Sequence, residues 1–156
     1  ISAYQTKTNR RKLTGAYADA SPIVAAIYLE EEKDVLTSDA NVSSMMGMRL
    51  SVEADEYVRN KETLNIGGVK YEVIHTPGHT KGSCCYYFEE DKILISGDTL
   101  FLESTGRTDF PTGSMSTIVR SIKERLLCLP EDVKVYSGHG PVTTIGHEAQ
   151  YNPFIS

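Results

Sequence analysis

The sequence predicts a mixed α/β fold in an α+β arrangement, because the apolar residues change their period along the chain. In the middle third, strand-like runs at 57–66 and 69–74 flank Gly67-Gly68, and a second hairpin spans 83–96. From Ser114 onward the period lengthens to that of an amphipathic helix, and single helices then separate the later strands. We therefore expect mixed sheets flanked by helices.

The N-terminal third is less clearly patterned. Residues 2–18 are mostly polar and favour a helix only weakly, whereas 23–29 is a continuous apolar run typical of a strand covered on both faces. The acidic stretch 30–36 predicts a short helix, and the methionine-containing segment 39–48 predicts irregular structure with core-filling side chains.

The C-terminal third alternates helix, strand and helix. The first helix begins near Ser114 and ends before Pro130, a strand covers 133–136, and a last helix runs from Thr143 or Thr144 to Asn152. The apolar face of the first helix is formed by Met115, Ile118, Val119, Ile122 and Leu126.

Length and composition fit one globular domain over residues 1–156. The chain has 40% hydrophobic and 24% charged residues, and its net charge of −5 argues against a nucleic-acid partner. Its three cysteines include the neighbours Cys84 and Cys85, which point to opposite faces of a strand and favour reduced core residues in a cytoplasmic protein. No leader pattern or apolar run of membrane-spanning length is present, so we expect no membrane partner.

Three side chains that are typical metal ligands occupy equivalent places. His79, Asp98 and His139 each follow a predicted strand, and each has a glycine neighbour that lets the backbone bend toward a shared cleft. Imidazole and carboxylate together suit zinc, iron or manganese, with zinc the default. Pro77 and Gly78 exclude a helix between His75 and His79, so we assign His75 a supporting role.

Other enzyme classes lack their motifs. The sequence has no phosphate-binding Gly-rich loop and no Gly-x-Ser-x-Gly elbow, which argues against nucleotide-binding and serine-hydrolase functions. We place His147 on the final helix and expect it to be exposed.

The motif blocks resemble those of the metallo-β-lactamase-fold hydrolases, within them the compact glyoxalase II-like (hydroxyacylglutathione hydrolase-like) subgroup. The blocks are HTPGHTKGS, SGDTLF, STGRTDFPTGS, GHGPVTTIGHE and NPF, and the resemblance extends from residue 23 to the C-terminus. It implies a portion of the αβ/βα sandwich, a thioester substrate such as an acyl-glutathione, and attack by a metal-activated hydroxide on the acyl carbonyl.

The same resemblance implies roles for individual residues. His79 becomes a ligand of the first metal, Asp98 the catalytic carboxylate bridging both metals, and His139 a ligand of the second. By their position just after the Asp98 loop, Arg107 and Asp109 either pair to brace the site or line its mouth, or else form a plain loop salt bridge. Thr99 is expected to orient Asp98.

One family block is missing from these residues. The His-x-His-x-Asp-His block, which supplies four further ligands, does not occur, so the chain reads as a C-terminal portion of a hydrolase without its N-terminal strands. We expect the isolated chain to be inactive, and any single ion to use His79, Asp98 and His139 together with water or a neighbouring chain. We also expect a second copy or a partner segment to cover the exposed sheet.

Two alternatives stay open. One is a persulfide dioxygenase of the same fold that uses a single iron. The other is a non-catalytic remnant that acts in binding or assembly. We expect one or two zinc ions in the complete enzyme, while this chain alone can lack them.

Overall fold

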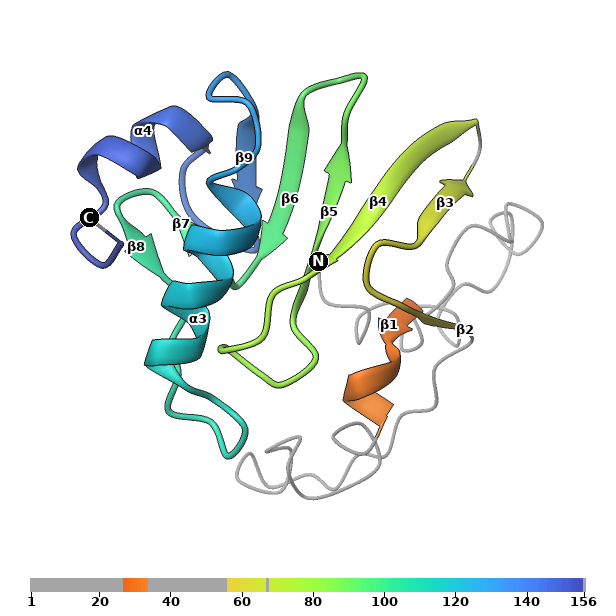
Figure 1. The fold of residues 1–156 in the computed structure, drawn as a ribbon, viewed down its shortest axis with the longest axis horizontal. Coiled ribbons are helices and arrows are strands. Elements are labelled where there is room, and N and C mark those ends of the chain that lie inside the picture. Colours follow the sequence, from red (N-terminus) through yellow and green to blue (C-terminus); the bar gives the residue numbers. More distant parts are fainter. Residues whose placement is uncertain (1–26, 34–55, 67, 156) are drawn as a thin grey trace, which may run out of the picture.

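The computed structural model describes residues 27–33, 56–66 and 68–155, and its main feature is a six-stranded mixed sheet (Figure 1). The strand order is β10-β9-β6-β5-β4-β3. These strands are β3 (Thr63–Ile66), β4 (Val69–His75), β5 (Cys84–Phe88), β6 (Ile93–Gly97), β9 (Lys134–Ser137) and β10 (Thr143–Thr144). Two short strand pairs accompany this sheet in the described ranges, namely β1 (Ile27–Leu29) with β2 (Glu56–Val58) and β7 (Leu100–Phe101) with β8 (Ser104–Thr105).

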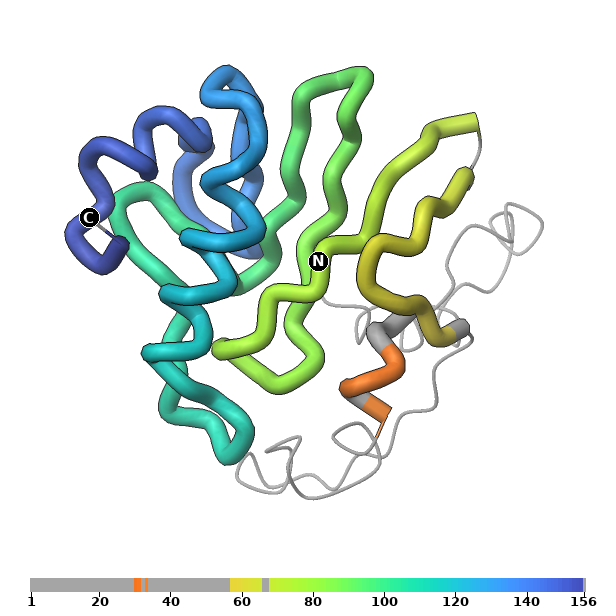
Figure 2. The backbone as a smooth tube through the Cα atoms, viewed as in Figure 1, coloured from red at the N-terminus to blue at the C-terminus, as the bar shows by residue number. Residues whose placement is uncertain are grey.

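Three strands of the main sheet run in the same direction. β5 is antiparallel to both β4 and β6, and β9 is parallel to β6. The carboxyl ends of β4, β6 and β9 therefore meet at one edge of the sheet, as the chain path in Figure 2 shows. The segments that follow these three ends carry His79, Asp98 and His139.

A bulge shapes the end of β6. The register between β6 and β9 shifts between Ile95 and Gly97, and Gly97 has a φ of 51°, a conformation that favours glycine. The Ser96 hydroxyl donates a hydrogen bond to the Leu100 carbonyl at 2.8 Å and holds the turn that follows. The bulge thus changes the direction of the chain immediately before Asp98.

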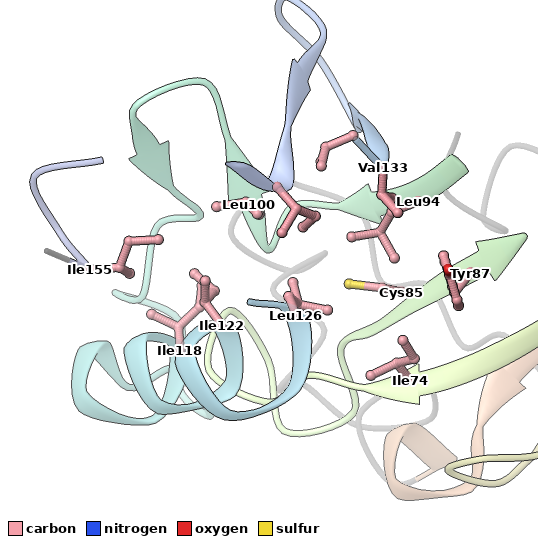
Figure 3. Packing of buried hydrophobic residues seen from close by; sticks show 12 residues of the cluster. Ile74, Cys85, Tyr87, Leu94, Leu100, Ile118, Ile122, Leu126, Val133 and Ile155 are labelled. Atoms are coloured by element: carbon pink, nitrogen blue, oxygen red, sulfur yellow. The ribbon is translucent and has the colours of Figure 1, made fainter. Parts of the chain in front are cut away.

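One face of the sheet is covered by the helix α3 (Met115–Ser121) and its continuation η4 (Ile122–Leu126). Ser114 caps α3 by accepting from the Thr117 N–H, and η4 has the wider π winding, with a Leu127 N–H to Ile122 C=O bond of 3.0 Å. The predicted amphipathic helix is confirmed. Figure 3 shows its side chains packed against the sheet, and the fully buried members of this core are Cys85, Leu94, Leu100, Ile118, Ile122, Leu126, Val133 and Val135.

The opposite face of the sheet is also apolar but less covered. Val73 is buried there, whereas Ile95 and Tyr136, which are register partners on β6 and β9, are 36% and 37% exposed. The covering of this face by another chain stays a prediction.

The first predicted hairpin has an additional break. Instead of one strand over 57–66, β2 and β3 are separated by a turn in which Lys61 has a φ of 64°. The Asn60 side chain accepts from the His75 N–H at 2.9 Å, and the Lys61 N–H donates to the Val73 carbonyl at 2.7 Å. These bonds hold the turn against β4, so β2 is free to pair with β1.

The remaining expectations are met in part. The final helix α4 spans Ile145–Tyr151 and begins at a Thr144 cap, as predicted. A 3₁₀ turn at Glu30–Glu32 replaces the start of the predicted acidic helix. The expectations for 2–18, 39–48 and the beginning of 23–29 fall outside the described residues. No helix in the described ranges has the length and apolarity needed to cross a membrane.

Candidate metal centre

The loop between β4 and β5 presents His79. The Thr76 N–H donates to the Ser83 carbonyl at 2.7 Å and closes the base of the loop. Gly78 has a φ of 139°, and a Cβ at this position would lie 2.4 Å from Ile118 on α3. Glycine therefore lets the loop pack directly against α3, and this contact helps to position His79 at the edge of the sheet.

Asp98 lies between the two histidines. Its Oδ2 is 3.6 Å from His79 Nε2, and its Oδ1 is 3.8 Å from His139 Nε2. A nitrogen and an oxygen that bind one tetrahedral ion lie about 3.4 Å apart, given bond lengths of about 2.0–2.2 Å. Each pair of donors is therefore close to the separation that a shared ion requires, and the donor set fits metal binding.

The three donors do not converge on one point. Each histidine faces a different oxygen of Asp98, and within the described part of the chain no group of three or more His, Cys, Asp or Glu side chains is arranged to hold one ion. The expectation that one ion uses all three ligands together is not supported by this geometry. The arrangement instead offers two positions, each with one histidine and one oxygen of the shared carboxylate.

The ring of His79 is held on its other side. Its Nδ1 lies 2.8 Å from the carbonyl oxygen of Arg107, and Phe110 contacts the ring edge-on with centroids 5.0 Å apart. The His79 side chain is 17% exposed, whereas that of His139 is 80% exposed. His139 packs against Phe101 at 4.6 Å, and its carbonyl accepts from the Ser137 hydroxyl at 2.7 Å.

Two glycines let the backbone approach Asp98 closely. A Cβ on Gly106 would lie 1.7 Å from the Asp98 carbonyl oxygen, and one on Gly138 would lie 2.4 Å from Asp98 Oδ1. The Gly138 N–H also donates to the Gly97 carbonyl at 2.7 Å. The sequence pattern pointed to glycines beside His139, but nothing in it singled out Gly106, Phe101 or Phe110.

A cavity of about 360 Å³ opens over these residues. Arg107 lines it, and the guanidinium forms two hydrogen bonds of 2.6 Å with the Asp109 carboxylate. This bonding lowers the pKa of Asp109 to about 2. Both alternatives for this pair are thus seen together, since it is a loop salt bridge and Arg107 lines the cavity. The other lining residues are His79, Asp98, Phe101, Leu102, Ser104, Thr105, Gly106, His139, Gly140 and Pro141.

The remaining predicted residues lie further from the carboxylate. The buried Thr99 hydroxyl hydrogen-bonds to Thr76 Oγ1 at 3.0 Å rather than to Asp98, so it supports the loop bases. His75 Nε2 donates to the Lys81 carbonyl at 2.8 Å, within the loop that carries His79. His147 lies on α4 with a side chain that is 35% exposed, and it pairs with Glu103 at 3.0 Å.

A carboxylate between two histidines, at the carboxyl edge of a mixed sheet, is a donor set whose chemistry suits a metal ion. The family model of the metallo-β-lactamase superfamily matches the sequence over residues 15–139. The chain therefore belongs to this superfamily. The predicted family and fold class are thereby confirmed.

Two curated relatives carry informative names. The chain is 39% identical to "Probable metallo-hydrolase YqgX" of Bacillus subtilis over 83% of its own length and 64% of that protein. It is 43% identical to "Hydroxyacylglutathione hydrolase GloC" of Haemophilus influenzae over 61% of its own length and 45% of that protein. The matches thus span less than two thirds of the length of each of these relatives.

Solved structures share the fold. "BLEG-1 B3 metallo-beta-lactamase" is 40% identical with a TM-score of 0.75, covering 83% of this chain and 64% of that one. "TTHA1623 in a di-iron-bound form" is 32% identical with a TM-score of 0.68, covering 82% of this chain and 63% of that one. The similarity thus includes a protein that holds two iron ions.

Proposed function

We propose that this chain is part of a metal-dependent hydrolase that cleaves thioesters in the manner of glyoxalase II. The observation that carries the proposal is the placement of the Asp98 carboxylate between His79 and His139 at the floor of a cavity. The similarity to a protein named as a hydroxyacylglutathione hydrolase supports a thioester substrate.

In this proposal each histidine supplies one nitrogen, and Asp98 supplies one oxygen to each of two adjacent positions. His79, Asp98 and His139 would hold a metal there, which would supply Lewis-acid chemistry for activating water and polarising the acyl carbonyl. Gly106 lets the backbone pack against the main-chain carbonyl of Asp98, and Gly138 lets it pack against the carboxylate, so both glycines help to position Asp98. The apolar wall formed by Phe101, Leu102 and Pro141 offers a surface for the acyl group.

We propose zinc as the native metal, because imidazole and carboxylate suit it. The di-iron form of a similar protein makes iron the main alternative, and the same donors accept manganese. A persulfide dioxygenase that uses one iron is the second candidate function. Iron in the purified protein together with oxygen uptake in the presence of a persulfide would favour it over the hydrolase.

We further propose that the 156-residue chain by itself turns over little or no substrate. Each of the two positions receives two protein donors from the described residues, whereas catalytic zinc sites usually have three. Low metal affinity follows, and a neighbouring chain or further residues are needed to complete each position.

Metal analysis of single variants tests the ligand assignment. We expect His79→Ala, Asp98→Ala and His139→Ala each to lower the bound metal, with Asp98→Ala lowering it most because both positions lose a donor. His147→Ala is the matched control, since this histidine pairs with Glu103 outside the cavity. Equal metal content in all four variants and the parent chain would refute the assignment.

A thioester assay tests the activity separately. The chain is incubated with an acyl-glutathione and Zn²⁺, Fe²⁺ or Mn²⁺, and the released thiol is measured. Metal-dependent release that Asp98→Ala abolishes supports the thioesterase and contradicts the inactivity of the isolated chain. If no thiol is released, the result supports the inactivity of the isolated chain. A longer protein that contains this chain together with the further metal ligands is then expected to hydrolyse the same thioester.

A further inference from the structure

Two residues of one loop contact His79, and a third residue of the loop binds one of these two. The Arg107 carbonyl accepts from Nδ1 at 2.8 Å, and Phe110 lies edge-on to the imidazole at 5.0 Å with an interplanar angle of 90°. The Arg107 guanidinium lies over the Phe110 ring, 4.8 Å from its centroid. It also forms two hydrogen bonds of 2.6 Å with Asp109.

The hydrogen bond to Arg107 determines which ring nitrogen of His79 carries the proton. A backbone carbonyl can only accept a hydrogen bond, so Nδ1 must be the donor. In the neutral imidazole Nε2 then has a free lone pair, and Nε2 is the atom that faces Asp98 at 3.6 Å. The tautomer that the loop selects is therefore the one whose Nε2, on the side of Asp98, is free to bind a metal.

The guanidinium of Arg107 already has partners within its own loop. A planar guanidinium binds one carboxylate through two parallel N–H groups, and its remaining face lies on an aromatic ring. Among the described residues that line the cavity, Arg107 is the only lysine or arginine. An anionic substrate would meet only the N–H groups of Arg107 that Asp109 does not use.

We propose that Arg107, Asp109 and Phe110 form a positioning clamp on His79. Asp109 fixes the guanidinium, the guanidinium fixes Phe110, and the Arg107 carbonyl together with the Phe110 ring holds the imidazole in its Nδ1–H tautomer. All three are positioning residues that act through His79. The proposal rests on the role of His79 as a metal ligand, but its effect on the tautomer exists without any metal.

The first test is the His79 tautomer in the metal-free protein. Long-range ¹H–¹⁵N correlation spectra at pH 8, where an ordinary histidine is neutral, show which ring nitrogen carries the proton. The His79 signals are assigned by their absence in His79→Gln. We expect Nδ1–H in the parent chain and a mixture of tautomers in Asp109→Ala and Phe110→Leu.

A second salt bridge supplies the matched control. Lys92 and Asp132 form an ion pair of similar exposure whose residues do not line the cavity. Asp132→Ala removes that pair and leaves the clamp intact, so we expect the tautomer of His79 to stay unchanged. Backbone amide spectra of each variant confirm that the fold is retained.

The second test is metal affinity, measured by Zn²⁺ titration. Loss of groups that orient a ligand typically lowers metal affinity by about 10–100-fold, and we expect a loss in this range for Asp109→Ala. Asp109→Glu keeps the carboxylate and is expected to restore most of the affinity, while Asp132→Ala has no effect.

Two results would overturn the clamp. One is an unchanged Nδ1–H tautomer in both Asp109→Ala and Phe110→Leu. The other is unchanged Zn²⁺ affinity in Asp109→Ala together with weaker binding of an anionic thioester analogue in Arg107→Ala, which would make Arg107 a substrate-binding residue. Failure of the thioesterase proposal is recognised separately, since the tautomer measurement needs neither metal nor substrate.

Discussion

Gly106→Ala is the sharpest test of how tightly the backbone encloses Asp98. The added Cβ would lie 1.7 Å from the Asp98 carbonyl oxygen and 2.9 Å from its carbonyl carbon. Separations under 3.0 Å are essentially never seen for real Cβ atoms, so the two segments must move apart by at least about 1.3 Å. The displaced atoms belong to the backbone, which has no alternative rotamer to adopt.

Two effects follow from this displacement. The Gly106 N–H to Thr99 carbonyl bond of 3.2 Å is stretched, and we expect the free energy of unfolding to fall by about 1–3 kcal/mol, as for other overpacked sites. The movement also changes the separations between Asp98 and the two histidines. Because misplaced ligands weaken metal sites, we expect Zn²⁺ affinity to fall by about 10–100-fold.

The assay combines urea unfolding with Zn²⁺ titration, and Gly68→Ala is the control. Gly68 has a φ of 87°, so alanine there is strained, but its Cβ would meet no atom within 4 Å. A left-handed alanine costs about 1–2 kcal/mol, so this control loses stability without losing metal affinity. Unchanged Zn²⁺ affinity in Gly106→Ala would refute the close enclosure of Asp98.

Four further predictions concern the rest of the chain. Glu148→Gln should lower the free energy of unfolding, measured in urea, by about 1–3 kcal/mol. The buried Glu148 carboxylate accepts three hydrogen bonds, including one of 2.7 Å from Asn152, and the NH₂ group of glutamine would face one of these donors. Leu126→Ala should lower it by about 2–5 kcal/mol by opening a cavity in the core, with the same measurement. Burial raises the pKa of the Cys85 thiol from 9.0 to about 12, so between these pH values the unfolded chain loses a proton that the folded chain keeps. The thiol's contribution to the free energy of unfolding then falls by about 1.4 kcal/mol per pH unit, a slope that unfolding curves of Cys85→Ala should lack. Light scattering over a concentration series should show a mass above the 17.3 kDa of one chain, and a constant monomer mass would contradict self-association.

Much of the fold could be predicted from the periodicity of apolar residues along the sequence. The elements that were not predicted have identifiable physical causes. The hairpin of β5 and β6 and the helix that begins at Met115 are long enough to show a clear repeat. β7 and β8 have two residues each, too few for any period to show. The turn at Lys61 depends on hydrogen bonds to Val73 and His75 of β4, which lie more than ten residues further along the chain.

The sequence predicted those parts of the candidate site that depend on the type of side chain. His79, Asp98 and His139 stood out because each combines a ligand-type side chain with a strand end and a glycine. The group that orients His79 is a backbone carbonyl, which every residue possesses and which no sequence pattern marks. The division of the three donors into two pairs depends on distances of 3.6 and 3.8 Å, which only the packed structure provides.

The common direction of β4, β6 and β9 has a consequence for how a complete site is assembled. All three donors lie on loops anchored to one sheet with its own hydrophobic core, so their positions are set before any further ligand arrives. A segment that brings additional donors, whether from the same chain or from another, then meets a preorganised surface and has to order only itself. If the proposed further donors complete each position, they could therefore come from a separately supplied piece of protein, as in fragment complementation.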